Sequence, residues 1–198
     1  MKALLLIDLQ NDFCAGGALA VNGGDEVIKV ANQFINEFNI VIATQDWHPA
    51  NHLSFAINHE HRKPGDVINL AGIEQVLWPK HCVEFSKGAK FHSDLQITAI
   101  DYIQKKGTNK IIDSYSAFFE NDHKTHTGLD FYLKNKNITS LVILGLATDY
   151  CVKHSVLDAR RLSYKVKVVK AGCRAVNLKK NDESLAYHEM RRAGAVFI

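Results

Sequence analysis

The stretch LVILGLATDYCV, residues 141–152, joins a buried strand to a helix through a turn of small residues. The apolar run Leu141–Leu144 is typical of a strand buried on both faces, and a helical pattern begins near Asp149. This places Cys151 in the first helical turn, where unpaired N–H groups and the helix dipole favour negative charge on a thiolate or an oxyanion. Cys151 is therefore a candidate nucleophile, although a free cysteine is more often a small buried apolar residue.

Apolar runs and helical patterns alternate along the rest of the chain. The expected strands are 2–9, 40–44, 100–106, 141–144, 166–169 and 195–198, and the expected helices are 25 to about 39, 127–135, 149–162 and 182–192. Asp25 and Asp182 are expected to cap the helices that begin there, and residues 97–104 fit a short helix as an alternative to the third strand. The alternation predicts an α/β fold: a doubly wound, mostly parallel six-stranded sheet with helices on both faces.

The composition is that of an ordinary globular protein, and we expect one domain over residues 1–198. A formal net charge of +3 is too small to indicate a nucleic-acid partner. The first apolar run, residues 3–7, is shorter than a secretory signal requires, and no later run has the length to span a membrane. We therefore expect a cytoplasmic protein with four free cysteines and no membrane partner. The sequence allows a homo-oligomer without deciding the oligomeric state.

Parallel α/β sheets bind their ligands at the carboxyl ends of the strands. The candidates at those ends are Asp8, Asp46 with His48, Lys106, and the turn that leads to Cys151. A thiol, a carboxylate and an ammonium could form a nucleophilic triad, because the lysine favours the thiolate and the carboxylate can accept the thiol proton. In other proteins an aspartate such as Asp8 more often caps a helix, and a lysine such as Lys106 is more often solvated.

Residues 46–95 show no clear periodicity and contain six histidines and all three prolines, so we expect a functional segment without regular structure. Asp46, His48 and His81 are adequate ligands for one divalent zinc, iron or manganese ion and would leave positions open for water or substrate. His52 fits a fourth ligand and fits a supporting role equally well. Three further histidines of this segment are expected at the surface: His59, His61 and His92.

Three aromatic residues lie next to these candidates in the sequence. Phe13 follows the first strand, Trp78 precedes the histidine of WPKHCV, and Tyr150 adjoins the candidate nucleophile. Together they could wall a flat, ring-sized pocket, although each alone is more often a core residue.

Taken together, the motifs resemble the nicotinamidase/pyrazinamidase group of the isochorismatase-like cysteine hydrolases. The matching motifs are DLQNDF (8–13), ATQDWHPANHLSF (43–55), WPKHCV (78–83), KG with DSYSAF (106–107 and 113–118) and GLATDYCV (145–152). They occur in order and span residues 1 to about 175. DLQNDF marks only the superfamily, whereas DWHPANH followed by WPxHCV is specific to the nicotinamidase group.

The resemblance implies an isochorismatase-like hydrolase fold and a role for each member of the triad. Cys151 would be the nucleophile, Asp8 the proton acceptor and donor, and Lys106 the third member. Lys105 and Lys110 lie nearby, but the lysine of the family directly precedes a glycine, as Lys106 does.

The resemblance also implies a cis peptide between Leu146 and Ala147, with the N–H groups of Ala147 and Cys151 forming an oxyanion hole. One divalent metal ion would be held by Asp46, His48 and His81; members of the family differ in whether a further side chain joins them, so His52 stays open. Four residues would contact the substrate ring: Phe13, Trp78, Leu146 and Tyr150.

The implied reaction is the hydrolysis of nicotinamide to nicotinate and ammonia through a thioester, within NAD salvage, with pyrazinamide as a second substrate. The metal would orient the pyridine ring. Two alternatives remain open at this point. One is an amidohydrolase of the same superfamily that acts on a carbamoyl or ureido substrate without a ring-binding metal, and the other is a non-catalytic α/β binding module.

Overall fold

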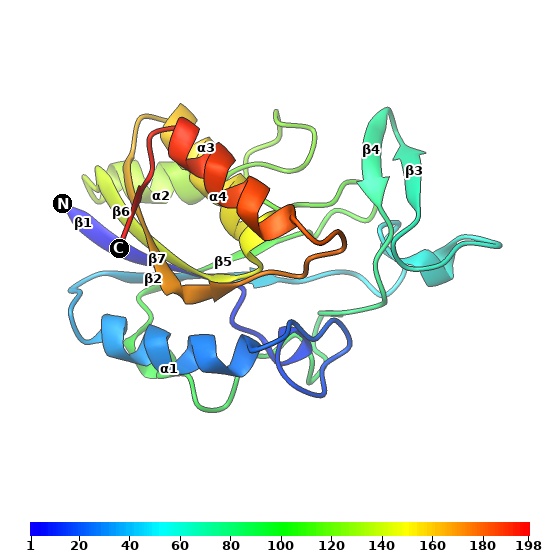
Figure 1. Cartoon of the computed structure of the whole chain (residues 1–198), viewed down its shortest axis with the longest axis horizontal. Helices are drawn as coiled ribbons and strands as arrows, with labels where there is room; N and C mark the ends of the chain where they lie inside the picture. The colour runs from blue at the N-terminus through cyan, green and yellow to red at the C-terminus, as the bar shows by residue number, and fades with distance from the viewer.

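The computed structural model describes residues 1–198 and has a central six-stranded sheet whose strands all pair in parallel (Figure 1). In order across the sheet the strands are β5 (Tyr102–Lys106), β2 (Val41–Asp46), β1 (Lys2–Ile7), β6 (Ser140–Leu146), β7 (Lys165–Arg174) and β8 (Val196–Phe197). The predicted doubly wound α/β sheet is confirmed. The third strand is β5, and the alternative helix is reduced to a single 3₁₀ turn at Ile97–Ala99.

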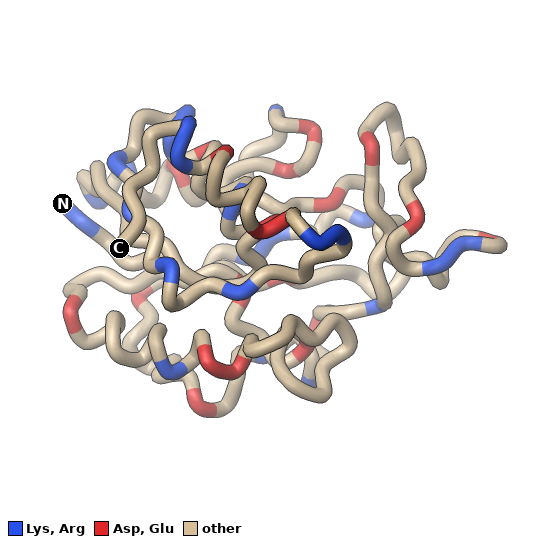
Figure 2. The backbone as a smooth tube through the Cα atoms, viewed as in Figure 1, with Lys and Arg blue, Asp and Glu red and all other residues tan.

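Helices cover both faces of this sheet (Figure 1). One face carries α1 (Gly24–Ile35), and the other carries α2 (Leu129–Asn135), α3 (Lys153–Arg161) and α4 (Asp182–Arg192). The buried residues of α1 recur at helical spacing, which explains why this segment packs one apolar face on the strands. No helix has both the length and the apolar character needed to cross a membrane. Figure 2 shows lysine and arginine interspersed with acidic residues along the backbone.

The predicted helix caps are wrong. Gly23 and Asn181 occupy the capping positions, and Asp25 and Asp182 lie inside the first helical turn. The carboxylate of Asp25 instead accepts the N–H of Ala15, so it fixes the preceding loop rather than the helix end. The first helix also stops at residue 35, before the expected end near residue 39.

The segment 46–95 contains regular structure that the sequence analysis did not predict. The strands β3 (Val67–Leu70) and β4 (Ile73–Val76) form an antiparallel hairpin that projects beside the sheet (Figure 1). Its two turn residues, Ala71 and Gly72, both have positive φ angles, 52° and 87°, as a tight two-residue hairpin requires. The strands are four residues long and mostly exposed or half-buried, which leaves too little apolar alternation for detection.

The parallel register brings the predicted strand-end residues to one edge of the sheet. Asp46 is paired with Lys106 across β2 and β5, and Ile7, directly before Asp8, is paired with Gly145 across β1 and β6. Gly145 has a φ of 142°, and a Cβ there would lie 2.2 Å from the carbonyl oxygen of Ile7. The close approach of these two central strands therefore depends on a glycine at position 145.

We predict that Gly145→Ala lowers the free energy of unfolding by about 2–5 kcal/mol, because backbone strain and a clash with a neighbouring strand add together. Gly65→Ala is the matched control: its φ is 91° and no atom lies within 4 Å of the added Cβ, so only the strain applies, about 1–2 kcal/mol. Urea unfolding followed by circular dichroism measures both. Equal decreases in the free energy of unfolding in the two variants would contradict a clash between residue 145 and β1.

Candidate active site

The side chain of Lys106 is almost fully buried, 1% exposed, and is surrounded by acidic and thiol groups. Its Nζ lies 2.9 Å from Asp8 Oδ2 and 3.4 Å from Cys151 Sγ, and it also donates to Asp46 Oδ1. A fourth contact runs to the carbonyl oxygen of Ser114, 2.9 Å away. Burial alone would lower the pKa of Lys106, but Asp46 and Asp8 outweigh it and hold that pKa well above its usual range. Lys106 is therefore an ammonium ion at neutral pH.

Asp8 is oriented so that one carboxylate oxygen is fixed and the other faces the lysine. Its Oδ1 accepts the hydroxyl of Thr44 at 2.6 Å, while Oδ2 faces Lys106. Burial raises the pKa of Asp8, Lys106 opposes this rise, and Asp46 adds to it. A carboxylate with a raised pKa is a better proton acceptor than an exposed one.

The thiol of Cys151 lies beside this pair, since one oxygen of Asp8, one of Asp46 and the Sγ lie within 4.8 Å of one another. Burial raises the pKa of Cys151 well above its usual value, and Lys106 only partly opposes the effect. Cys151 is thus a protonated thiol at rest, and a base must take its proton before it can attack a substrate.

The turn before Cys151 is formed by a cis peptide between Leu146 and Ala147, as the family resemblance implies. A π-helical turn, Thr148–Val152, follows it and continues into α3. The N–H of Ala147 donates to no acceptor in the chain, and Ala147 lines the same cavity as Cys151. This N–H is therefore available to a ligand next to the sulfur.

A second group of buried side chains adjoins the first through Asp46. Its Oδ2 lies 3.6 Å from His48 Nε2 and 3.8 Å from His81 Nε2. The Nδ1 atoms donate instead to backbone carbonyls, His48 to Gly107 and His81 to Pro79, each at 2.8 Å. Both rings therefore direct their Nε2 atoms at Asp46, an arrangement that suits a divalent metal ion.

The charge of Asp46 agrees with such a site. Burial acts to raise its pKa, but Lys106 and His48 outweigh burial and hold that pKa well below the usual range. Asp46 is thus a carboxylate whose two oxygens face two different groups, the ammonium on one side and the imidazoles on the other.

His52 differs from His48 and His81 in which ring nitrogen carries the proton. Its Nδ1 accepts the N–H of Ser54 at 3.1 Å, so in the neutral ring the proton is on Nε2. Burial lowers the pKa of His52 to about 4, which keeps the ring neutral. In this tautomer Nε2 carries the proton and offers no lone pair to a metal ion, although one ligand-type atom each of His48, His52 and Asp113 lie within 4.8 Å of one another.

The three histidines expected at the surface differ in exposure. His61 is exposed, whereas His59 and His92 are half-buried. His92 lies within 4.8 Å of Cys14 and Asp25, measured between ligand-type atoms. Its Nδ1 accepts the N–H of Asp94, which again puts the proton on Nε2.

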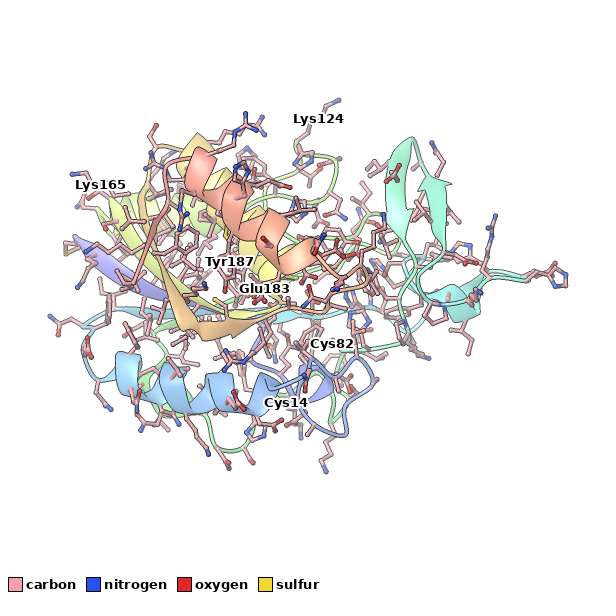
Figure 3. The ribbon with its side chains drawn as sticks, viewed as in Figure 1. Cys14, Cys82, Lys124, Lys165, Glu183 and Tyr187 are labelled. Carbon is pink, nitrogen blue, oxygen red and sulfur yellow. The ribbon has the colours of Figure 1, made fainter.

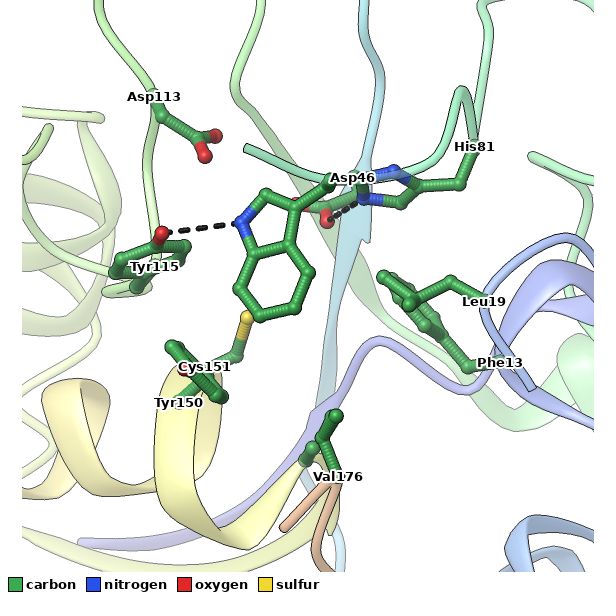
Figure 4. A pocket seen from close by; sticks show the side chains of 11 residues that line it. Phe13, Leu19, Asp46, His81, Asp113, Tyr115, Tyr150, Cys151 and Val176 are labelled. Atoms are coloured by element: carbon green, nitrogen blue, oxygen red, sulfur yellow. Dashed lines mark hydrogen bonds and ion pairs between the residues drawn. The ribbon is translucent and has the colours of Figure 1, made fainter. Parts of the chain in front are cut away.

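A cavity lies between the thiol and the histidines (Figure 4). Phe13, Trp78 and Tyr150 line it, as predicted, together with Asp46, His81, Ala147 and Cys151. Leu146 does not: its side chain points toward Gly24 at the start of α1. Four lining residues were not predicted, namely Leu19, Asp113, Tyr115 and Val176. Of these, Asp113 and Tyr115 belong to the DSYSAF motif, which was a usable signal, whereas Leu19 and Val176 lie in loops without any pattern.

The aromatic walls are fixed against one another. Trp78 and Tyr150 meet edge to face with ring centroids 4.7 Å apart, and Trp78 Nε1 donates to Tyr115 Oη at 3.1 Å (Figure 4). Phe13 meets His81 at 5.6 Å on the opposite side. The cavity is therefore suited to a flat ring that presents a reactive group to Cys151.

Comparison with known proteins extends this picture. A model of the isochorismatase domain family matches residues 2–198. The nicotinamidase of Escherichia coli (strain K12) is 52% identical, over 98% of this chain and 92% of that protein. The solved nicotinamidase/pyrazinamidase of Acinetobacter baumanii has a TM-score of 0.97 at 44% identity, covering 100% and 95% of the two chains. The pyrazinamidase of Pyrococcus horikoshii, solved in complex with zinc, has a TM-score of 0.80 at 32% identity, covering 100% and 98%.

We predict that Lys106→Met slows the labelling of Cys151 by iodoacetamide at pH 7.5 by about tenfold or more. Lys106 lowers the pKa of the thiol, so its loss raises that pKa further and moves the midpoint of labelling to higher pH. Each unit of increase in the pKa lowers the fraction of thiolate about tenfold. Mass spectrometry of labelled peptides resolves the four cysteines. Lys105→Met, at an exposed position of the same strand, is the control, and equal rates in both variants would remove Lys106 from the site.

Proposed function

This chain belongs to the isochorismatase family, and from that premise we propose that it is an amidohydrolase that converts nicotinamide into nicotinate and ammonia. The membership confirms the family that the motifs indicated. The observation that carries the proposal is the convergence of Asp8, Lys106 and Cys151 beside an aromatic cavity that Cys151, Asp46 and His81 also line. We further propose that a single domain, 1–198, performs this reaction in NAD salvage in the cytoplasm.

The first step is the attack of Cys151 on the carboxamide carbon. Asp8 takes the thiol proton, and the charge of Lys106 stabilises the Asp8 carboxylate before this transfer and the Cys151 thiolate after it. The negative oxygen of the tetrahedral intermediate is held by the N–H groups of Ala147 and Cys151. Each such donor typically contributes about 3 kcal/mol to the transition state.

The second half of the reaction returns the enzyme to its resting form. Asp8 gives its proton to the departing nitrogen, and the C–N bond breaks. Ammonia departs, and the acyl group remains on Cys151 as a thioester. Asp8 then accepts a proton from water, and the oxygen of that water attacks the thioester carbon. The C–S bond breaks, nicotinate is released, and the sulfur regains its proton.

We propose that Asp46, His48 and His81 hold one divalent zinc, iron or manganese ion. The bound ion would orient the pyridine ring through the ring nitrogen and would take no part in cleaving the amide. The two Nε2 atoms that face one carboxylate support these three ligands, and the hydrogen bond that His52 Nδ1 accepts from Ser54 supports leaving His52 out of the set. A zinc complex of a relative that is 32% identical supports the same kind of site here.

The aromatic residues provide the remaining selectivity. Phe13, Trp78, Tyr115 and Tyr150 would enclose a six-membered ring, and pyrazinamide, which has the same ring size, would fit the same space. A carbamoyl or ureido substrate would use neither the ring walls nor the imidazoles, so the cavity favours nicotinamide. A non-catalytic binding module would leave the buried Lys106 cluster without a role.

We predict that the purified protein releases ammonia from nicotinamide and that Cys151→Ala reduces this release by about 10³-fold or more, because no other cysteine lines the cavity. Coupled detection of ammonia together with chromatography of nicotinate measures the reaction. Cys173→Ala, at a buried cysteine outside the cavity, should keep the wild-type rate.

Inactivity of the wild-type protein after supply of zinc, iron or manganese would refute the nicotinamide proposal. Activity that survives in Cys151→Ala would refute the choice of nucleophile while keeping the reaction.

We predict that His81→Ala reduces the bound divalent metal from one ion per chain to well below that value, because one of three ligands is lost. The KM for nicotinamide should rise, while iodoacetamide should label Cys151 at the wild-type rate. Elemental analysis by mass spectrometry measures the metal. His61→Ala, at an exposed position, is the control, and an unchanged metal content in His81→Ala would contradict the ligand set.

A further inference from the structure

The carboxylate of Asp12 lies outside the cavity but is bonded to the turns that build one of its walls. Its Oδ2 accepts the N–H of Cys82 at 2.7 Å, and its Oδ1 accepts the N–H of Ala18 at 3.1 Å. The backbone carbonyl of Asp12 also accepts the N–H of Leu19 at 2.9 Å. One residue therefore ties the loop after β1 to the turn that contains His81.

The turn at Cys82 connects the two imidazoles. Cys82, labelled in Figure 3, follows His81 directly and is fully buried. Its φ is 45°, a backbone conformation that residues other than glycine rarely adopt. Its carbonyl oxygen accepts the N–H of His48 at 3.0 Å, and its own N–H is the one bound by Asp12. The backbone at residue 82 thus sets the positions of both histidines, and a short hydrogen bond to a carboxylate holds it there.

The same carboxylate also fixes the ring wall opposite Tyr150. Phe13 follows Asp12 in a 3₁₀ turn, and both Phe13 and Leu19 line the cavity. Phe13 in turn contacts His81 edge to face. A shift of the Asp12 side chain would therefore move the wall and the imidazole relative to one another.

Space for this carboxylate exists only because residue 88 is a glycine. A Cβ at Gly88 would lie 2.0 Å from Asp12 Oδ2, and the backbone carbonyl of Gly88 accepts the N–H of Asp12. The surroundings of Asp12 are thus built to receive a carboxylate in one position.

We propose that Asp12 is a positioning residue that sets the geometry of the metal ligands and of the ring wall through the N–H of Cys82. The inferred effect of Asp12 on substrate binding rests on the proposed function. The inferred effect on metal binding rests on the positions of the two imidazoles alone. Asp12 affects the binding of metal and substrate. It does not change the reactivity of Cys151, because the partners of Cys151 are Lys106 and Asp8.

The test compares Asp12→Ala with Asp122→Ala. Asp122 is a second carboxylate that accepts backbone N–H groups of its own loop, from Lys124 and Thr125, without touching the turn at Cys82. Zinc affinity is measured by competition with a chromophoric chelator on the full-length protein. Asp12→Ala should bind zinc about 10–100-fold more weakly, the usual effect of removing a group that orients a ligand, and Asp122→Ala should match the wild type. In Asp12→Ala the KM for nicotinamide should rise more than kcat falls, with unchanged labelling of Cys151 by iodoacetamide.

Two further variants keep the test decisive if Asp12→Ala does not fold. Asp12→Asn retains one acceptor oxygen and should have an intermediate zinc affinity, and Gly88→Ala should weaken zinc binding by displacing the carboxylate. Wild-type zinc affinity in the folded Asp12 variants, or an equal loss in Asp122→Ala, would overturn the proposal. A wild-type protein that binds zinc but releases no ammonia would refute the proposed function, and the zinc comparison would still decide the role of Asp12.

Discussion

A buried ammonium ion joins the two halves of the candidate site. Lys106 contacts Asp8 on the side of the thiol and Asp46 on the side of the imidazoles, and it is almost completely removed from solvent. Burying a charge is costly unless it is paired, and two carboxylates offset the lost hydration of this one. The two carboxylates and the one ammonium together carry a net charge of −1. A divalent cation among Asp46, His48 and His81 would therefore be stabilised by the same buried charges that hold the lysine in place.

The order of strands explains why these groups meet. The four neighbours β5, β2, β1 and β6 end at the same edge, and their last or next residues are Lys106, Asp46, Asp8 and the turn before Cys151. Residues far apart in the chain become adjacent because parallel strands share the direction of their carboxyl ends. The close contact of β1 with β6 at Gly145 brings the base and the nucleophile together, since Asp8 and Cys151 lie just beyond it.

Sequence reasoning reached the parts of the site that lie at strand ends, because buried parallel strands have long apolar runs and their ends are easily located. It failed for the residues whose side-chain positions depend on the geometry of loops. Leu19 and Val176 line the cavity from loops that carry no periodicity, and the side chain of Leu146 points away from the cavity toward α1. The β3–β4 hairpin escaped prediction because its short strands are largely solvated. The proton on His52 is fixed by a hydrogen bond to Ser54 that no sequence pattern reveals.

The pKa values of the buried groups suggest how the nucleophile is controlled. Burial keeps Cys151 protonated although Lys106 lies 3.4 Å away, so the resting site holds a thiol rather than a thiolate. Burial also raises the pKa of Asp8, which brings the acceptor closer in basicity to the thiol that it must deprotonate. In the proposed reaction, proton transfer would become favourable as the sulfur bonds to a carbonyl carbon and negative charge moves to an oxygen held by backbone N–H groups. The thiolate would then form together with the bond to substrate, once the aromatic walls have positioned the ring.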